Sequence, residues 1–201
     1  MKKLGIIALA AIMMGCSAKS DEKMQNSNKQ QMVIENILTR VSVRQFTGET
    51  ISNEQIQTLL HAAMAAPTAM NRQPWAFMVI TDTTMLARLG EAFPFCHCGK
   101  GAACAFVMCG DMNKVIEACP DFWIHDVSAA TENLLLAAHA MDLGAVWTGV
   151  FPNMDRVNEV RAMLAIPEQY VPLCIVPVGH PAEQPEIKDK FLEENIHYNV
   201  W

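Results

Sequence analysis

The sequence predicts an α+β domain, and three observations support that class. The chain has 201 residues, of which 51% are hydrophobic and 18% charged, so it has enough apolar side chains for one buried core. Several segments place apolar residues at intervals of three and four, as amphipathic helices do. Others are short apolar runs that end at turn residues, as buried strands do. Because no internal repeat is present, we expect a single domain in which helices pack on a sheet.

The N-terminal segment has the pattern of a signal peptide. Lys2 and Lys3 precede an uncharged run over residues 4–15, and Cys16 follows. Twelve helical residues span about 18 Å, which is short of the ~30 Å hydrocarbon core of a bilayer. This order of charge, apolar run and cysteine resembles a bacterial lipoprotein signal peptide. The resemblance implies cleavage before Cys16, a lipid on its thiol, and a membrane-anchored protein of the cell envelope, on the periplasmic or outer-membrane side.

Residues 17–31 form a polar tract rich in Lys, Ser, Asn and Gln, which predicts a flexible tether. A buried N-terminal helix is the alternative for the run before Cys16, but that run has no capping residue and the polar tract follows it. The chain is therefore expected to divide into a signal peptide over 1–15, a tether over 16–31 and a folded domain over 32–201.

The domain is expected to begin with a short amphipathic helix over residues 32–38. The segment that follows alternates strictly between polar and apolar residues. Because successive side chains of an extended chain point to opposite sides, Arg40, Ser42 and Arg44 share one side. Three groups able to donate hydrogen bonds are thereby brought together.

The next helix begins at Ser52, where Gln55 completes a capping box, and Pro67 marks its end. Two apolar runs after it, over 75–81 and 102–109, are predicted to be buried strands. Each is short and bounded by turn residues, so both fit into the sheet of an α+β domain.

A long helix is predicted over 121–143, with apolar residues on one face and Ala and Leu on its other sides. Such a helix is expected to be buried in the domain or at a subunit interface, and Gly144 ends it. At its start, His125 and Asp126 could form a proton-transfer pair. We expect Asp126 to accept hydrogen bonds from nearby amides instead.

The last predicted elements are an apolar run over 145–150, a helix over 155–164 and a strand over 173–178. Pro172 and Pro177 have no backbone N–H to donate. The final strand is therefore expected to lie near a sheet edge or to contain a break.

Charge and cysteine content exclude some function classes. The formal net charge is −6 and the estimated pI is near 5.5, which argues against a nucleic-acid-binding protein. Seven cysteines are too few for a disulfide scaffold. The Cys96-His97-Cys98 run lacks the spacing of a standard zinc site, so no metal is expected. Cys104 and Cys109 lie five apart on a predicted strand, so they point to opposite faces and cannot pair.

Two polar segments are candidate binding elements. The Arg-x-Ser-x-Arg segment 40–44 can hold a phosphate or a polar ring edge through charge-assisted hydrogen bonds, although three solvated residues after a helix are the alternative. The loop over 66–75, which reads A-P-T-A-M-N-R-Q-P-W, is stiffened by two prolines around Thr68, Asn71 and Gln73. The choice between a binding loop and a plain helix-to-strand connection stays open on the loop sequence alone.

The order of these motifs resembles the nitroreductase family of flavoenzymes. The R-x-S-x-R segment is followed by the capped helix, by A-P-T-x-x-N-x-Q-P-W and by a hydrophobic strand. The resemblance continues through Cys109-Gly110-Asp111, the long helix with G-A-V-W-T-G over 144–149, and G-H-P-A-E over 179–183. It implies an α+β homodimer with a central, mainly antiparallel sheet flanked by helices, and two FMN sites in the dimer interface.

The resemblance also implies roles for individual residues. Arg40 and Ser42 are expected on the FMN phosphate and ribityl chain. Arg44 is expected at the pyrimidine edge, where a cation favours the anionic reduced flavin. The remaining flavin-contacting positions are Pro67, Thr68, Ala69 and Asn71 from the partner subunit, the backbone of Trp147, Thr148 and Gly149 near N5 and O4, and Lys188 or Lys190 at the phosphate. A solvated charged turn is the alternative for the two lysines.

The implied reaction passes a hydride from NADH or NADPH to flavin N5 and from there to a nitroaromatic, a quinone or a similar acceptor. Segments 85–100 and 122–125 are expected to select the acceptor. No catalytic side chain is expected, and Gly99-Lys100-Gly101 lacks the spacing of a dinucleotide fingerprint. The alternatives are a flavin- or ligand-binding lipoprotein without turnover, a flavin reductase, or a dehalogenase on the same scaffold.

Overall fold

A computed structural model describes residues 27–201, which divide along the chain between Thr39 and Arg40 into two units. Within the first unit, residues 27–39 form a helix, so residues 27–31 are helical and not part of a flexible tether. The predicted signal peptide and Cys16 lie outside the described residues. Over 27–201 the structure has no helix both long and apolar enough to cross a bilayer.

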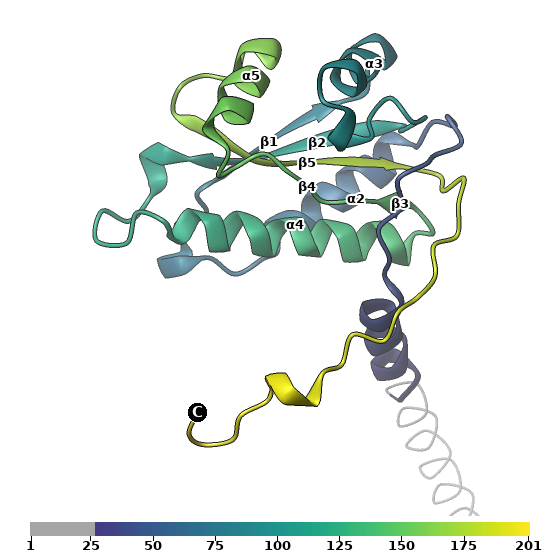
Figure 1. Ribbon diagram of the computed structural model, residues 1–201, viewed down its shortest axis with the longest axis vertical. Helices are drawn as coiled ribbons and strands as arrows, with labels where there is room; N and C mark the ends of the chain where they lie inside the picture. Colours follow the sequence, from purple (N-terminus) through teal and green to yellow (C-terminus); the bar gives the residue numbers. More distant parts are fainter. Residues whose placement is uncertain (1–26) are drawn as a thin grey trace, which may run out of the picture. The chain divides into compact units, whose positions relative to one another are not determined.

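The second unit is built on a five-stranded sheet in which every pairing is antiparallel. The strand order is β1 (Trp75–Ile80), β2 (Cys104–Asp111), β5 (Tyr170–Gly179) and β3 (Gly144–Ala145), and β4 (Thr148–Gly149) also pairs with β5. Figure 1 shows the sheet lying between two layers of helices. The predicted class, a mainly antiparallel sheet flanked by helices, is confirmed.

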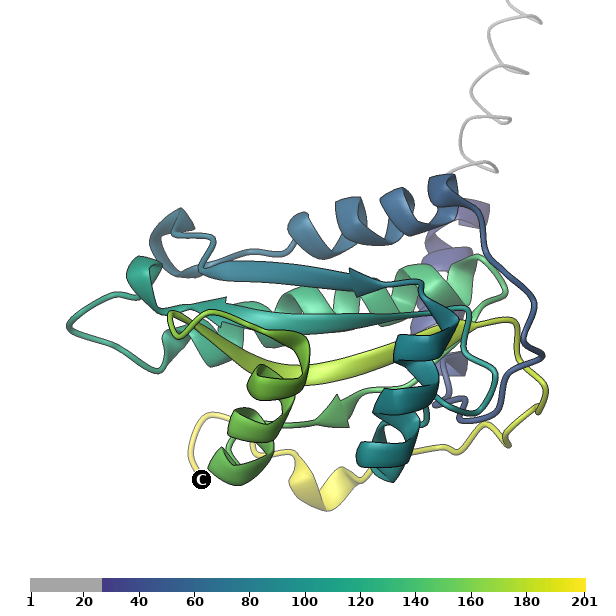
Figure 2. The same ribbon diagram turned by 90° about the horizontal axis from the view of Figure 1, so that it is seen from above.

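Two helices cover each face of the sheet. Helices α2 (Asn53–Met64) and α4 (Phe122–Ala140) lie on one face, and α3 (Thr83–Ala92) and α5 (Met154–Leu164) lie on the other (Figures 1 and 2). Their apolar sides bury two separate clusters, one on each face. Such a three-layer arrangement lets both sides of the strands be buried.

Strand β2 is buried along its whole length and contributes to both clusters. Cys104 and Met108 belong to the cluster under α2 and α4, while Val107 and Cys109 belong to the one under α3 and α5. The alternation follows from the two-residue period of a strand. The prediction that Cys104 and Cys109 point to opposite faces is confirmed.

Strand β5 corrects one prediction. It pairs with β2 on one side and with β3 and β4 on the other, so it is a central strand and not an edge strand. The alternative of a break is confirmed, because Met108 faces Cys174 whereas Cys109 faces Pro172, which leaves Leu173 as an extra residue. The bulge explains how a proline is tolerated there.

Helix boundaries follow local signals where the sequence has them. Ser52 and Gln55 form the predicted capping box, in which each side chain accepts from the other residue's backbone N–H. Helix α3 was not predicted, although Asp82 caps it by accepting from the Met85 N–H at 2.7 Å. It occupies part of the segment expected to select the acceptor.

Candidate functional site

The Arg-x-Ser-x-Arg segment runs beside β3. The Val43 N–H donates to the Ala145 carbonyl at 3.0 Å, and Val43 and Phe46 are buried in a small cluster. Val41 also packs against this cluster, so alternate residues of the segment face the core and the side chain between Val41 and Val43 is directed away from it. Arg40 and Ser42 are half-buried, and Arg44 is exposed. All three polar side chains are thus more exposed than Val43, as the predicted alternation requires.

Arg40 is held by a residue of α4. Its Nε atom lies 3.3 Å from Oε1 of Glu132, and the exposed fractions of the two side chains are 18% and 48%. A partly exposed ion pair of this kind contributes little to stability, but it orients the guanidinium. The role of Glu132 could not be predicted from the sequence, because its partner Arg40 lies in a distant part of the chain.

Arg44 belongs to a charged group formed by three chain segments. Its backbone N–H donates to Oε1 of Glu183 at 2.6 Å, and its Nη1 to the Ser42 carbonyl at 3.4 Å. The pKa of His97 is lowered, first by burial and then by the positive charges of Arg44 and Lys100, while Glu183 acts in the opposite direction. Arg44 and Lys100 thus lie close enough to act on His97, and the carboxylate of Glu183 opposes them.

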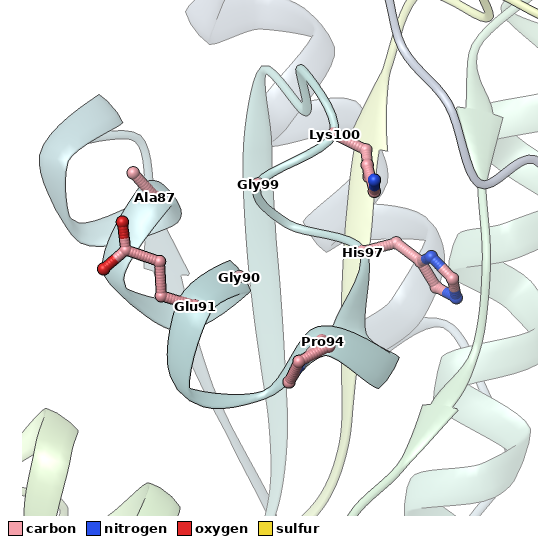
Figure 3. Close-up of a pocket in the computed structure, with 7 residues that line it drawn as sticks. All are labelled: Ala87, Gly90, Glu91, Pro94, His97, Gly99 and Lys100. Atoms are coloured by element: carbon pink, nitrogen blue, oxygen red, sulfur yellow. The ribbon is translucent and has the colours of Figure 1, made fainter.

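A pocket of about 300 Å³ lies on the segment from α3 to the loop before β2. Its lining consists of Ala87, Gly90, Glu91, Pro94, His97, Gly99 and Lys100. In Figure 3 the side chains of His97 and Lys100 extend to the side opposite Glu91. One side of the pocket is therefore formed by His97 and Lys100, which lie near Arg44.

The segment 147–149 offers backbone groups at β4. Thr148 is buried and its hydroxyl donates to the Ile175 carbonyl, which fixes β4 on β5. Trp147 is half-buried and Gly149 exposed. A β-carbon added to Gly149 would meet no atom within 4 Å, so the space beside this backbone is open. A planar ligand can approach a glycine backbone closely.

The loop with Pro67, Thr68, Ala69 and Asn71 lies at the other end of α4. The Ala69 N–H donates to Oδ1 of Asp126 at 2.9 Å, as expected for an amide-bonded Asp126. Figure 1 shows this loop near the start of α4, whereas β3 lies near its end. Asp126 and Ala140 are about 20 Å apart at 1.5 Å per residue. The loop and Val43 of the 40–44 segment are therefore attached toward opposite ends of α4, although Arg40 reaches back to Glu132, about 9 Å along the helix from Asp126.

Lys188 and Lys190 lie on the exposed C-terminal segment, which leaves the end of β5 and runs away from the sheet (Figure 1). Within residues 27–201 neither lysine side chain makes a hydrogen bond or an ion pair, and Asp189 between them accepts from the Phe191 N–H at 3.0 Å. The structure does not join them to the other predicted phosphate ligands.

The cysteines do not form a metal site in the described part of the chain. No group of three or more His, Cys, Asp or Glu side chains there is arranged to hold a metal ion. The six cysteines among these residues are free thiols. Five of them are buried and Cys119 is half-buried.

Comparison with known proteins supports one family. The nitroreductase family matches residues 37–94 and 100–180. An NADH dehydrogenase/NAD(P)H nitroreductase of Methanothermobacter thermautotrophicus is 41% identical over 169 residues, which cover 84% of this chain and 87% of that protein.

Two solved structures of similar fold support the same family. A protein of the same description from Parabacteroides distasonis is 42% identical, with a TM-score of 0.79 over 85% of this chain and 99% of that one. The NADPH:FMN oxidoreductase of Vibrio harveyi, solved with NAD⁺, is 27% identical, with a TM-score of 0.74 over 84% of this chain and 76% of that one. With its order of motifs kept on the same three-layer fold, the chain belongs to the nitroreductase family.

Proposed function

We propose that the protein is an FMN-dependent oxidoreductase that uses NADH or NADPH. The observation that carries the proposal is the arrangement of the Arg-x-Ser-x-Arg segment beside β3, with the open backbone of Gly149 on the neighbouring β4. The NAD(P)H nitroreductase and NADPH:FMN oxidoreductase among its relatives support the same activity.

The described residues fit FMN in two respects. Arg40, Ser42 and Arg44 are donors suited to a phosphate and to an electron-rich ring edge. A β-carbon at Gly149 would enter open space, as expected where a flat ring lies against backbone. In this proposal Arg40 and Ser42, with Lys188 or Lys190, hold the phosphate and ribityl chain, Arg44 faces the pyrimidine, and Trp147, Thr148 and Gly149 approach the ring.

When bound, FMN supplies the redox chemistry by accepting a hydride at N5 and passing it on. The protein's own residues bind and orient. Arg44 favours negative charge at the ring edge that it faces. Nitroaromatics and quinones are the proposed acceptors, and the pocket beside His97 lies on the segment proposed to select them.

We further propose a homodimer that completes each site. The loop 67–71 is attached near the start of α4, whereas Val43, between Ser42 and Arg44, pairs with β3 beyond the end of that helix, and a second copy is proposed to supply the loop. Exposed large apolar side chains also gather at the two ends of the described chain, five in residues 27–39 and seven in residues 187–201, out of seventeen among the described residues. Such exposure is typical of surfaces that a partner covers.

The membrane anchor is a separate proposal that rests on the sequence pattern around Cys16. A lipid on this thiol would hold the domain at the cell envelope through the following polar segment. Labelling with a radioactive fatty acid in a bacterial host is expected to mark the wild-type protein and not Cys16→Ser. Equal labelling of both would contradict the lipidation of Cys16.

The test of function uses the purified domain. The wild type is expected to show the absorbance of bound flavin after FMN is added, and to oxidise NADH in the presence of a nitroaromatic or a quinone. Arg40→Ala should weaken FMN affinity about tenfold or more, since a charge-assisted bond to phosphate is lost. Arg88→Ala, which removes an exposed arginine on α3, is the matched control and should bind FMN like the wild type.

Two outcomes would count against the proposal. A wild type that binds no FMN would remove the flavoenzyme function altogether. A wild type that binds FMN but does not oxidise NADH with any acceptor would favour the alternative of a flavin-binding lipoprotein without turnover.

A further inference from the structure

Asp126 is a buried carboxylate that accepts a hydrogen bond from a loop distant in sequence. It lies in the first turns of α4 with 6% of its surface exposed, and its Oδ1 accepts the Ala69 N–H at 2.9 Å across 57 residues of chain. A carboxylate taken out of water needs strong hydrogen-bond partners. Its partner here is a backbone group of the loop Pro67–Asn71 and not a catalytic group.

That loop adopts a conformation which its residues do not favour. Met70, Asn71 and Gln73 all have left-handed φ angles, of 52°, 53° and 49°. For residues other than glycine such angles are disfavoured and persist only where the surroundings hold them. Contacts with the surrounding structure are therefore needed to hold the loop in this conformation.

Hydrogen bonds within the loop fix its shape. The Asn71 N–H donates to the Thr68 carbonyl at 3.1 Å, the Gln73 N–H to the Thr68 hydroxyl at 3.1 Å, and the Gln73 side-chain amide to Oδ1 of Asn71 at 3.2 Å. All these bonds are local. They set the conformation, but they do not attach the loop to the rest of the domain.

Attachment comes from helix α4. Asp126 binds the loop itself, and Asn133, two turns further along the same helix, donates from its side-chain amide to the Ala62 carbonyl at 3.1 Å near the end of α2. The chain from the end of α2 to the loop is thus held on one rigid helix at two points. Of the two, only the Asp126 bond reaches the loop.

We propose that Asp126 is a positioning residue that holds the Pro67–Asn71 loop ready for the flavin of the partner subunit. The inference rests on the proposed function and deepens it. Asp126 acts through Ala69 and does not contact the flavin. A loop already held in its bound shape loses less conformational freedom when the ligand arrives, so removing the tether should weaken binding.

The experiment compares three variants by FMN affinity, read from flavin fluorescence, and by hydrogen exchange of the 66–73 segment without FMN. Asp126→Ala should exchange faster in this segment and bind FMN about tenfold more weakly or worse. Asp126→Asn keeps an oxygen that can accept the Ala69 N–H, and should stay within about threefold of the wild type. Asp121→Ala removes an exposed carboxylate that caps nothing at the same helix end, and should match the wild type.

Each outcome is decisive. If Asp126→Ala binds FMN like the wild type, or if Asp126→Asn loses as much affinity as Asp126→Ala, the positioning role is overturned while the proposed function stands. If the wild type itself binds no FMN, the proposed function fails and this role fails with it. Should Asp126→Ala not fold, Asp126→Leu, which keeps the volume of the side chain without an acceptor, replaces it with the same expected result.

Discussion

Two glycines near the candidate site differ in what a β-carbon would meet. At Gly144 it would lie 2.6 Å from Cγ1 and 2.8 Å from Cβ of Val43, which is closer than side chains pack. At Gly149 it would meet no atom within 4 Å. Gly144 is therefore needed for the packing of the Arg-x-Ser-x-Arg segment on β3. The space beside Gly149, by contrast, is open to a ligand.

We expect the two glycine-to-alanine changes to separate stability from binding. Gly144→Ala should lower the free energy of unfolding by about 1–3 kcal/mol, as overpacking does, and Val43→Ala in the same chain should restore part of it. Gly149→Ala should leave stability within about 0.5 kcal/mol but weaken FMN binding about tenfold or more. Urea denaturation and flavin titration measure both. Equal losses of stability would contradict this division.

Single residues could be predicted from the sequence where the signal is local. The alternation around Arg40, Ser42 and Arg44 follows from the extended chain and needs no tertiary information. The expected amide bond of Asp126 is confirmed, but its donor, Ala69, could not be named because the fold alone brings the two together. Glu132 was missed for the same reason: an exposed glutamate on a helix gives no indication of a distant arginine.

Elements with their own start and stop signals were predicted well. The capping box of α2 is an example, because Ser52 and Gln55 lie three residues apart. Strand β5 shows where local rules fail. Proline excludes ordinary ladder pairing, which pointed to an edge, yet the bulge at Leu173 lets Pro172 lie in a central strand. Whether a strand is central depends on its neighbours, which no local pattern contains.

The buried thiols of Cys104 and Cys109 in strand β2 lead to a prediction about how stability depends on pH. Burial raises the pKa of Cys104 and of Cys109 to about 12, from 9.0 when unperturbed. The folded chain therefore keeps protons that the unfolded chain releases. The free energy of unfolding should be unaffected by these thiols below pH 9 and should fall as pH rises from 9 to about 12.

Cys109→Ala should reduce that fall by up to about 1.4 kcal/mol per pH unit, with urea denaturation at a series of alkaline pH values as the measurement. Cys119→Ala, at the half-buried cysteine, is the matched control and should change the pH dependence less. A pH dependence that is the same in Cys109→Ala and the wild type would show that Cys109 does not contribute.

At the scale of the whole molecule, the class of fold follows from sequence patterns, whereas the assembly was expected only from the family resemblance. Periodicity distinguishes helices from strands, so the α+β class follows from the chain alone. The homodimer was expected from the family resemblance, and the structure adds that the loop Pro67–Asn71 is attached near the start of α4 while Val43 pairs with β3 beyond its end. The exposure of apolar residues such as Phe191 and Trp201 could not be predicted from the sequence either, because it depends on how the chain folds.

The last prediction concerns these exposed ends. If the C-terminal segment is an arm that packs on a second copy, replacing Phe191, Leu192 and Trp201 by serine should weaken dimerisation at least about tenfold, because each apolar side chain buried at an interface contributes about 1.5–3 kcal/mol. The sheet should stay folded, since all three side chains are exposed in the single chain. Lys188→Ala with Lys190→Ala is the matched control on the same segment, and should weaken FMN binding without changing assembly. Sedimentation over a range of protein concentrations measures the dimer, and a serine variant as dimeric as the wild type would show that the interface lies elsewhere.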